Sequence, residues 1–307
     1  MKRPRALIRE ALPAVNRITE RFGFVVSPVH YYGDSPSRRW LVAHEDLWRR
    51  PTAMRSPRWD LDDQVAWLRD RCRPFVAEVA GFATHRAAVD SQAGPGFGPV
   101  ESQILHCVIR STQPARIIEV GSGVSSLVAL HAAGLNRGEG RPARVTCIEP
   151  HPSSVLRQTS QIELIAHPAQ EVSLDTFQQL EAGDILFIDS SHSVRTGSEL
   201  ARLYLEVLPS LRPGVLVHVH DIYLPYVFSP WVLRRPFDWQ ETTLLAGLLC
   251  DNPHLLVRAC LSALHHDRGS DLAALLPDYR PASIRRGLAD GELAGRHYPS
   301  SIWMSTV

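Results

Sequence analysis

Residues 116–130 constrain the fold of this 307-residue chain more than any other stretch. The run 117–120 is apolar apart from one acid, which is typical of a buried parallel strand with both faces covered. Gly121 and Gly123 follow, and their lack of a side chain allows a sharp turn that exposes backbone N–H groups to a ligand. Apolar residues then recur with helical spacing. A strand, a glycine turn and a helix N-terminus in this order predict a pocket for a nucleotide-like ligand.

This loop differs from two common phosphate-binding loops. The dinucleotide fingerprint G-x-G-x-x-G needs a third glycine where the chain has Ser126, and a P-loop needs a lysine, although the only lysine here is Lys2. Instead, Glu119 precedes the first glycine, and a second acid, Glu149, ends the next apolar segment, 144–149. An acid at the second position can accept both hydroxyls of a ribose. An acid beside the glycine loop would repel a pyrophosphate and suits a ligand with a cationic amino-acid group.

The two acids in strand order resemble the class I S-adenosylmethionine-dependent methyltransferases. In these enzymes the first acidic loop holds the methionine part of the donor, and the second acid holds its ribose. The resemblance therefore implies S-adenosylmethionine as the cofactor. If Glu149 holds the ribose, the segment 169–171 falls where the edge of the adenine would lie. The residues that we expect to contact the donor are Glu119, Gly121, Ser122, Gly123, Glu149, Gln170 and Asp189.

Apolar segments alternate with helical patterns through the rest of the chain. Further strands are expected at 144–149, 162–165, 184–189, 215–221, 255–261 and 300–307, with helices between most of them, including one at 198–211. This alternation predicts an α/β fold with a doubly wound, mostly parallel sheet. The resemblance implies the Rossmann-like methyltransferase version of this fold, with an antiparallel C-terminal edge strand.

A turn-rich segment at 94–99 predicts a domain boundary. Residues 1–93 are expected to form a mainly helical and partly extended N-terminal appendage, and residues 94–307 the catalytic domain that binds S-adenosylmethionine. The appendage is either a lid over the pocket or a segment with a packing role, and the sequence favours neither. A second segment, 223–239, is dense in aromatic residues and is expected to cover the substrate.

Ionisable residues follow four of the predicted strands. The first two strands end in the acids of the glycine-loop motif, the fourth is followed by Asp189 and His192, and the fifth ends in His220 and Asp221. Ligands of open α/β sheets bind beyond the carboxyl ends of the strands, so these groups are expected to lie at one edge of the sheet. This coincidence predicts an enzyme. We interpret His192 as the general base that removes a proton from an acceptor hydroxyl or amine.

Asp189, His220 and Asp221 are expected to be neighbours across adjacent strand ends. Two carboxylates and an imidazole suit a divalent metal ion, and the segment resembles metal-assisted O-methyltransferases that place acids after the same two strands. An imidazole departs from an all-oxygen magnesium site, so Mg, Mn, Fe and Zn are all considered. The alternative is that these groups act in acid–base chemistry or substrate binding without metal. A purely structural alternative for His192 is a nearby hydrogen bond, with Asp189 capping a turn.

Several stretches resemble one bacterial branch, the methyltransferase-domain proteins of natural-product and sugar-modifying pathways. They are 27–32, 117–123, 187–198, 211–222 and 301–303. We therefore predict a methyltransferase of secondary metabolism that acts at oxygen on a small-molecule acceptor. A C- or N-methyltransferase, or a non-catalytic protein that binds S-adenosylmethionine, are the alternatives. The motifs do not specify the acceptor or the oligomeric state, and a homo-oligomer stays open.

Composition narrows the remaining function classes. The formal net charge is +1 with no block of basic residues, so neither nucleic acid nor a membrane surface is an expected partner. No apolar run approaches the roughly 20 residues of a membrane span. The five cysteines are scattered, without Cys-x-x-Cys spacing, and the basic first residues lack an apolar signal core. A cytoplasmic protein is expected.

Overall fold

The computed structural model describes residues 4–28, 36–54, 59–94, 96–235 and 238–307. The chain separates into two compact units, Met1–Arg49 and Arg50–Val307. The predicted boundary at 94–99 falls inside the second unit, and the division 1–93 and 94–307 stays a prediction. Most of the stretch 27–32 that carries part of the family resemblance lies outside the described residues. Within the described part of the chain, no helix is both long enough and apolar enough to cross a membrane.

The first unit is helical, as predicted. It contains α1 (Pro4–Thr19), the 3₁₀ helix η1 (Glu20–Phe22), α2 (Arg38–Ala43) and α3 (Glu45–Trp48). The Ser37 hydroxyl accepts a hydrogen bond from the N–H of Trp40, which is the usual way to cap the first turn of a helix such as α2. Gly23, with φ +77°, ends η1 in the left-handed region that favours glycine.

The second unit is built on a seven-stranded sheet with the order β3-β2-β1-β4-β5-β9-β6. The first five strands in this order are parallel, and β9 pairs antiparallel with both β5 and β6. The fold prediction is therefore confirmed, with the C-terminal strand β9 inside the antiparallel edge pair and β6 outermost. The strands are β1 (Arg116–Val120), β2 (Arg144–Ile148), β3 (Ile162–Ile165), β4 (Ile185–Ile188), β5 (Leu216–His220), β6 (Leu255–Cys260) and β9 (Ser301–Thr306).

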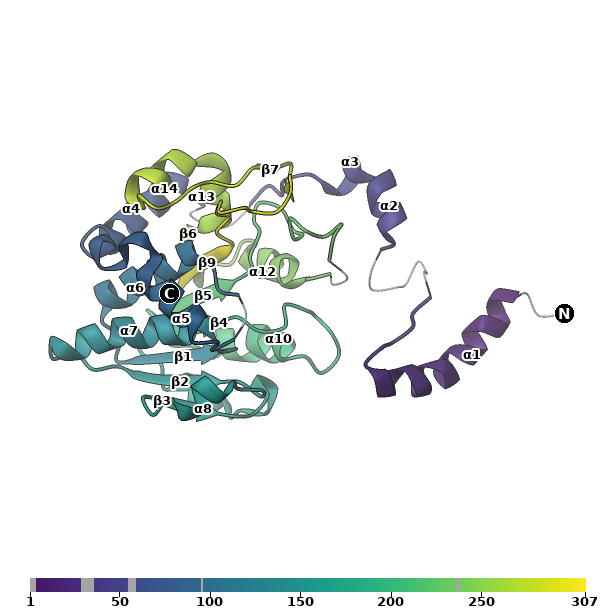
Figure 1. Ribbon diagram of the computed structural model, residues 1–307, viewed down its shortest axis with the longest axis horizontal. Helices are drawn as coiled ribbons and strands as arrows, with labels where there is room; N and C mark the ends of the chain where they lie inside the picture. Colours follow the sequence, from purple (N-terminus) through teal and green to yellow (C-terminus); the bar gives the residue numbers. More distant parts are fainter. Residues whose placement is uncertain (1–3, 29–35, 55–58, 95, 236–237) are drawn as a thin grey trace. The chain divides into compact units, whose positions relative to one another are not determined.

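Helices cover both faces of this sheet (Figure 1). One apolar core includes Ile117 and Phe187 and packs under α4 (Leu61–Cys72), α6 (Pro99–Thr112) and α7 (Val124–Gly138). The other includes Ile118 and Ile188 and packs under η4 (Leu203–Val207) and α12 (Glu241–Leu249). Neighbouring residues of one strand belong to different cores, because side chains alternate across a sheet.

The predicted helix at 198–211 is present with an irregular centre. It consists of α10 (Glu199–Arg202), a π-helical stretch η4 and α11 (Leu208–Ser210) in one continuous run. The remaining helices are η2 (Val76–Phe82), α5 (Ala83–Asp90), α8 (Ser154–Gln158), η3 (Ala169–Glu171), α9 (Leu174–Gln178), α13 (Leu261–Asp267) and α14 (Gly269–Leu275). A short hairpin, β7 (Ile284–Arg285) and β8 (Leu288–Ala289), lies in the long connection before β9.

Candidate active site

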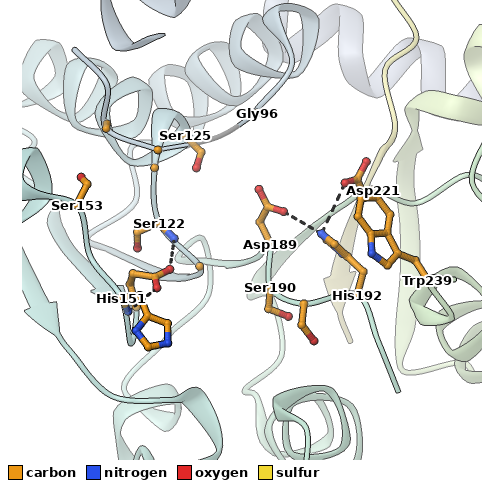
Figure 2. Close-up of a pocket in the computed structure, with 16 residues that line it drawn as sticks. Gly96, Ser122, Ser125, His151, Ser153, Asp189, Ser190, His192, Asp221 and Trp239 are labelled. Atoms are coloured by element: carbon orange, nitrogen blue, oxygen red, sulfur yellow. Dashed lines mark hydrogen bonds and ion pairs between the residues drawn. The ribbon is translucent and has the colours of Figure 1, made fainter. Parts of the chain in front are cut away.

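A cavity of about 540 Å³ lies at the carboxyl ends of β1, β4 and β5 (Figure 2). It is lined by residues of the glycine loop and by side chains that follow β2, β4 and β5. Those that the argument uses are Gly121, Glu149, Asp189, His192, Asp221 and Trp239. The structure thus brings the predicted residues to one edge of the sheet, because parallel strands end on the same side.

A second cavity, of about 620 Å³, shares one wall with the first. Gly121, Glu149 and Asp189 line both cavities, and the second extends to Ile148 and Gln170. The side chain of Gln170 donates a hydrogen bond of 3.2 Å to the carbonyl of Gly197. An elongated ligand along the shared wall would therefore reach the predicted adenine region at one end and His192 at the other.

Gly121 is required by the close approach of two strand ends. Its φ is +81°, and a Cβ at this position would collide with the backbone carbonyl of Asp189. The N–H of Gly121 donates to the carbonyl of Ile148 at 2.9 Å, and the N–H of Asp189 donates to the carbonyl of Val120 at 2.8 Å. The glycine loop therefore lies directly beside Asp189. A side chain at position 121 would prevent this close approach.

Glu149 organises the loop and faces both cavities. One carboxylate oxygen accepts from the N–H of Ser122 at 3.2 Å, and the other accepts from the N–H of His151 at 2.7 Å (Figure 2). These bonds leave acceptor capacity on both oxygens, since a carboxylate offers about four lone-pair sites. The predicted ribose contact of Glu149 is consistent with this position.

Glu119 lies beneath the glycine loop rather than in the cavity wall. Its carboxylate is 1% exposed and accepts hydrogen bonds of 2.5 Å from the hydroxyls of Ser125 and Ser126. The Ser126 hydroxyl in turn accepts from the N–H of Gly123 at 3.0 Å, so Glu119 supports the loop from below. Burial raises the pKa of Glu119 to about 7, although these serine hydrogen bonds act in the opposite direction. Its predicted contact with the donor stays a prediction.

Four side chains converge between the ends of β4 and β5, and we call them the strand-end cluster: Asp189, His192, His220 and Asp221. His192 Nε2 lies 3.4 Å from Asp189 Oδ1 and 3.6 Å from Asp221 Oδ2. His220 Nδ1 lies 3.2 Å from Asp189 Oδ1 and 3.8 Å from Asp221 Oδ2. Figure 2 shows the His192 ring reaching between the two carboxylates, with Trp239 beside it.

Two members of this cluster have an uncommon backbone conformation. His192 has φ +57° and Asp221 has φ +53°, which lie in the left-handed region that residues other than glycine seldom adopt. Such conformations persist only where the surroundings hold them, and they gather at functional sites. In both residues the turn directs the side chain to the cavity end of the strand.

The charges in the cluster stabilise one another. Although burial acts in the opposite direction, the charge of His220 and hydrogen bonds with both histidines hold the pKa of Asp189 well below its usual value. Burial likewise opposes the charge on the imidazoles. At His192, hydrogen bonds with Asp189 and Glu241 outweigh the effect of burial and raise the pKa well above its ordinary value. At His220, the charges of Asp189 and Asp221 outweigh the effect of burial and raise the pKa to about 9. The site therefore favours positive charge between two carboxylates.

Sequence reasoning missed several residues that contact the cluster. Glu241 bonds His192, while Tyr223 and Ser300 donate hydrogen bonds of 2.8 and 3.1 Å to Asp221. Trp239 lies with its ring centroid 4.8 Å from that of His192. Only the aromatic density of 223–239 had pointed to this wall. Glu241 had no signal beyond an acid at a helix start.

The predicted metal ligands Asp189, His220 and Asp221 do lie together. As it stands, however, no group of three or more His, Cys, Asp or Glu side chains in the described ranges is arranged to hold a metal ion. Asp189 and His220 contact each other directly, so an ion would have to separate them and replace the imidazole protons. The metal site stays a prediction.

Comparison with known proteins agrees with this geometry. Residues 118–222 match a family model described as a methyltransferase domain. An uncharacterized protein of Archaeoglobus fulgidus is 38% identical over 89 residues, which is 28% of this chain and 39% of that protein. The chain thus aligns with well under half of this curated relative.

Solved structures with a similar fold include two O-methyltransferases. One from Bacillus cereus, in complex with SAH, is 13% identical, with coverage of 76% of this chain and 96% of that chain and a TM-score of 0.43. TomG from Streptomyces achromogenes, in complex with SAM, is 16% identical, with coverage of 73% and 89% and a TM-score of 0.37.

The methyltransferase-domain match spans the region from β1 to the end of β5. This region contains the glycine loop, the two acids Glu119 and Glu149 and the strand-end cluster. This match supports the predicted enzyme class, an S-adenosylmethionine-dependent methyltransferase.

Proposed function

We propose that this methyltransferase domain methylates an oxygen atom of a small-molecule acceptor, with His192 as the base. The observation that carries the proposal is that Asp189, His192 and Asp221 line the first cavity, with Asp189 also in the wall that it shares with the second. S-adenosylmethionine supplies a methyl group on a positively charged sulfur. The acceptor must then lose a proton as it attacks, and His192 Nε2 is the nitrogen directed at the cavity.

Each part of the two cavities has a task in this proposal. Glu149 and Gln170 bind the nucleoside end of the donor, and the glycine loop binds its amino-acid end. Asp189 and Asp221 lie beside His192 Nε2 and stabilise the positive charge that the ring gains with the proton, and Trp239 excludes water from the acceptor side. His192 takes up the hydroxyl proton in its neutral form. Because the contacts with Asp189 and Glu241 raise its pKa, this form becomes populated at a higher pH than in an ordinary histidine.

The donor is tested first by calorimetric titration of metal-free protein with S-adenosylmethionine, with NAD as the control ligand. We expect micromolar binding of S-adenosylmethionine and no binding of NAD. Absence of donor binding would overturn the assignment of the two cavities.

The acceptor is tested by transfer of a radiolabelled methyl group to panels of phenols, sugars, amines and carbon acids. Label in a methyl ether supports the proposal. Label on nitrogen or carbon supports the C- or N-methyltransferase alternative. Donor binding without transfer to any panel member would favour a binding protein.

A divalent ion at Asp189, His220 and Asp221 is a second candidate role for the cluster. It is favoured by one observation, the stabilisation of positive charge between the two carboxylates. When bound, such an ion would lower the pKa of an acceptor hydroxyl. The test is calorimetric titration of the chelator-treated protein with Mg²⁺, Mn²⁺, Fe²⁺ and Zn²⁺. If the site binds an ion, Asp221→Asn should abolish the heat of binding.

A further inference from the structure

Glu241 is a buried acid outside the cavity that bonds the proposed base. It is the first residue of α12 and is 0% exposed. Its Oε2 accepts a hydrogen bond of 2.7 Å from His192 Nδ1, and its Oε1 accepts one of 2.8 Å from the hydroxyl of Tyr204. A carboxylate at this depth is costly unless both oxygens have donors. Among the described residues, these two side chains are its hydrogen-bond partners.

The same end of α12 also holds the backbone of the loop that carries His192. The N–H groups of Gln240 and Glu241 lie 3.0 and 3.3 Å from the carbonyl of His192. The side chain of Gln240 accepts from the N–H of Val194 at 3.2 Å. Side-chain and backbone contacts from one helix terminus therefore fix the turn in which His192 has φ +57°.

Tyr204 reaches Glu241 from the irregular centre of the α10–η4–α11 helix. It lies within the π-helical stretch η4 and is 1% exposed. A π-helical turn shifts the residues that follow it around the helix axis, and such turns are frequent at functional sites. The irregularity thus accompanies a hydroxyl group that contacts the buried carboxylate.

These contacts determine which nitrogen of His192 faces the cavity. Glu241 Oε2 lies 2.7 Å from Nδ1, closer than Asp189 and Asp221 lie to Nε2, at 3.4 and 3.6 Å. We therefore assign the proton of the neutral ring to Nδ1, with Nε2 directed at Asp189 and Asp221. In the familiar hydrolase triads, a buried carboxylate holds the imidazole in this way without touching the substrate.

We propose that Glu241 and Tyr204 are positioning residues that hold His192 with Nδ1–H bonded to the buried carboxylate and Nε2 presented to the acceptor. This inference rests on the proposed function, in which His192 is the base.

The direct test is nuclear magnetic resonance of the full chain labelled with ¹⁵N-histidine. The signal of His192 is assigned by its loss in His192→Ala. We expect a slowly exchanging Nδ1–H on His192, whose exchange becomes at least about tenfold faster in Glu241→Gln, because a neutral acceptor binds N–H more weakly than a carboxylate. The matched control is Glu206→Gln, an exposed glutamate of the same η4 stretch. An unchanged His192 signal in Glu241→Gln would overturn the proposal.

Tyr204→Phe is a milder second variant, since it keeps the carboxylate and removes one donor. It should shift the same Nδ1–H signal, whereas Tyr279→Phe, at a buried tyrosine bonded to His265 outside the cavities, should not. This variant keeps the test decisive if Glu241→Gln does not fold. A His192 signal that Tyr204→Phe leaves unmoved would remove Tyr204 from the proposal.

Turnover separates positioning from general stability. With the acceptor found in the transfer panels, Glu241→Gln should lower kcat about 10- to 100-fold and leave the dissociation constant of S-adenosylmethionine within twofold. In a His192→Ala background it should cause no further loss, whereas an additional loss there would indicate a merely structural role. If His192→Ala itself retains turnover, the proposed function fails. If only Glu241→Gln retains it, this inference alone fails.

Discussion

Two groups of charged side chains differ in how closely their charges are paired. The strand-end cluster lies where β4 and β5 finish. The second group, which we call the Arg110 cluster, contains Glu78, His106, Arg110, Asn136 and Glu139 and lies where α6 and α7 end, just before β1 and β2 begin. Parallel strands start at one edge of the sheet and finish at the other, so the two clusters occupy opposite edges.

The charged groups of the Arg110 cluster form short contacts with one another. The guanidinium lies 2.9 Å from Glu78 Oε2 and 2.6 Å from Glu139 Oε1, and it also donates to the side-chain oxygen of Asn136. His106 Nε2 lies 2.8 Å from the same oxygen of Glu78. These are short, charge-assisted contacts that join α6 and α7 to the η2 segment.

The charged groups of the strand-end cluster lie further apart from one another and next to a cavity. Its carboxylate–imidazole distances run from 3.2 to 3.8 Å, and two of its four residues have a left-handed backbone. The charges of the Arg110 cluster are thus paired tightly. Those of the strand-end cluster are placed by the backbone, and under the proposed function they can take a new partner.

The sharpest test of this contrast is His192→Ala. Loss of the proposed general base should lower methyl transfer by about 10²- to 10⁴-fold, while the affinity for S-adenosylmethionine changes little. The unfolding midpoint should fall, because the buried Glu241 loses one of its two donors. Radiolabel transfer and calorimetry measure the two quantities. A variant that transfers methyl groups at the normal rate would show that the strand-end cluster does not supply the base.

A second test concerns the donor end of the same edge. Glu149→Ala should weaken binding of S-adenosylmethionine about 10- to 100-fold, because it removes charge-assisted hydrogen bonds to the ligand and to the loop. The control is Glu163→Ala, an acid on β3 that pairs with Arg144. Equal donor affinity in the Glu149 variant and the control would contradict the ribose assignment.

At the opposite edge, Arg110→Met should affect stability alone. Removing the guanidinium leaves carboxylates without their partner and is expected to lower the free energy of unfolding by about 1–3 kcal/mol. Denaturant unfolding measures it, with Arg144→Met at an exposed pair as a control expected to cost much less. A large loss of donor affinity in folded Arg110→Met would break the division of roles.

The smallest expected effect is a pH dependence of the Arg110 cluster. Burial opposes the carboxylate of Glu78, but hydrogen bonds from Arg110 and His106 hold its pKa below the usual value. A lowered folded-state pKa gives a stabilisation that is complete above the unfolded value of about 4.3 and is lost as the pH falls through the folded value. The acid limb of the stability curve should therefore flatten in Glu78→Gln, and an unchanged limb would contradict this account.

Local sequence patterns were sufficient to predict most of the fold and many residues of the candidate site. The apolar runs, the glycine turn and the helical spacing of 198–211 each depend on residues close in the chain, so strand and helix positions could be predicted from them. Because parallel strands share an edge, the meeting of Asp189, His192, His220 and Asp221 also followed from strand order.

Other features depended on packing between distant segments. The end of α4 at Cys72 and the position of α5 were not predicted from the sequence. Glu119 lies below the loop because its strand alternation places it under the start of α7, where Ser125 and Ser126 take up its carboxylate. The sequence shows these three residues, but it does not show on which side of the loop the Glu119 carboxylate lies.

By itself, the sequence determined where the strands lie along the chain, the glycine turn and the edge of the sheet where the candidate site lies, since each is encoded by neighbouring residues. Only the tertiary structure decided that Glu241 bonds His192 across 49 positions of sequence and that Tyr204 supplies the second donor. A buried carboxylate is stable only where the whole fold brings donors to it, and no local pattern records that requirement.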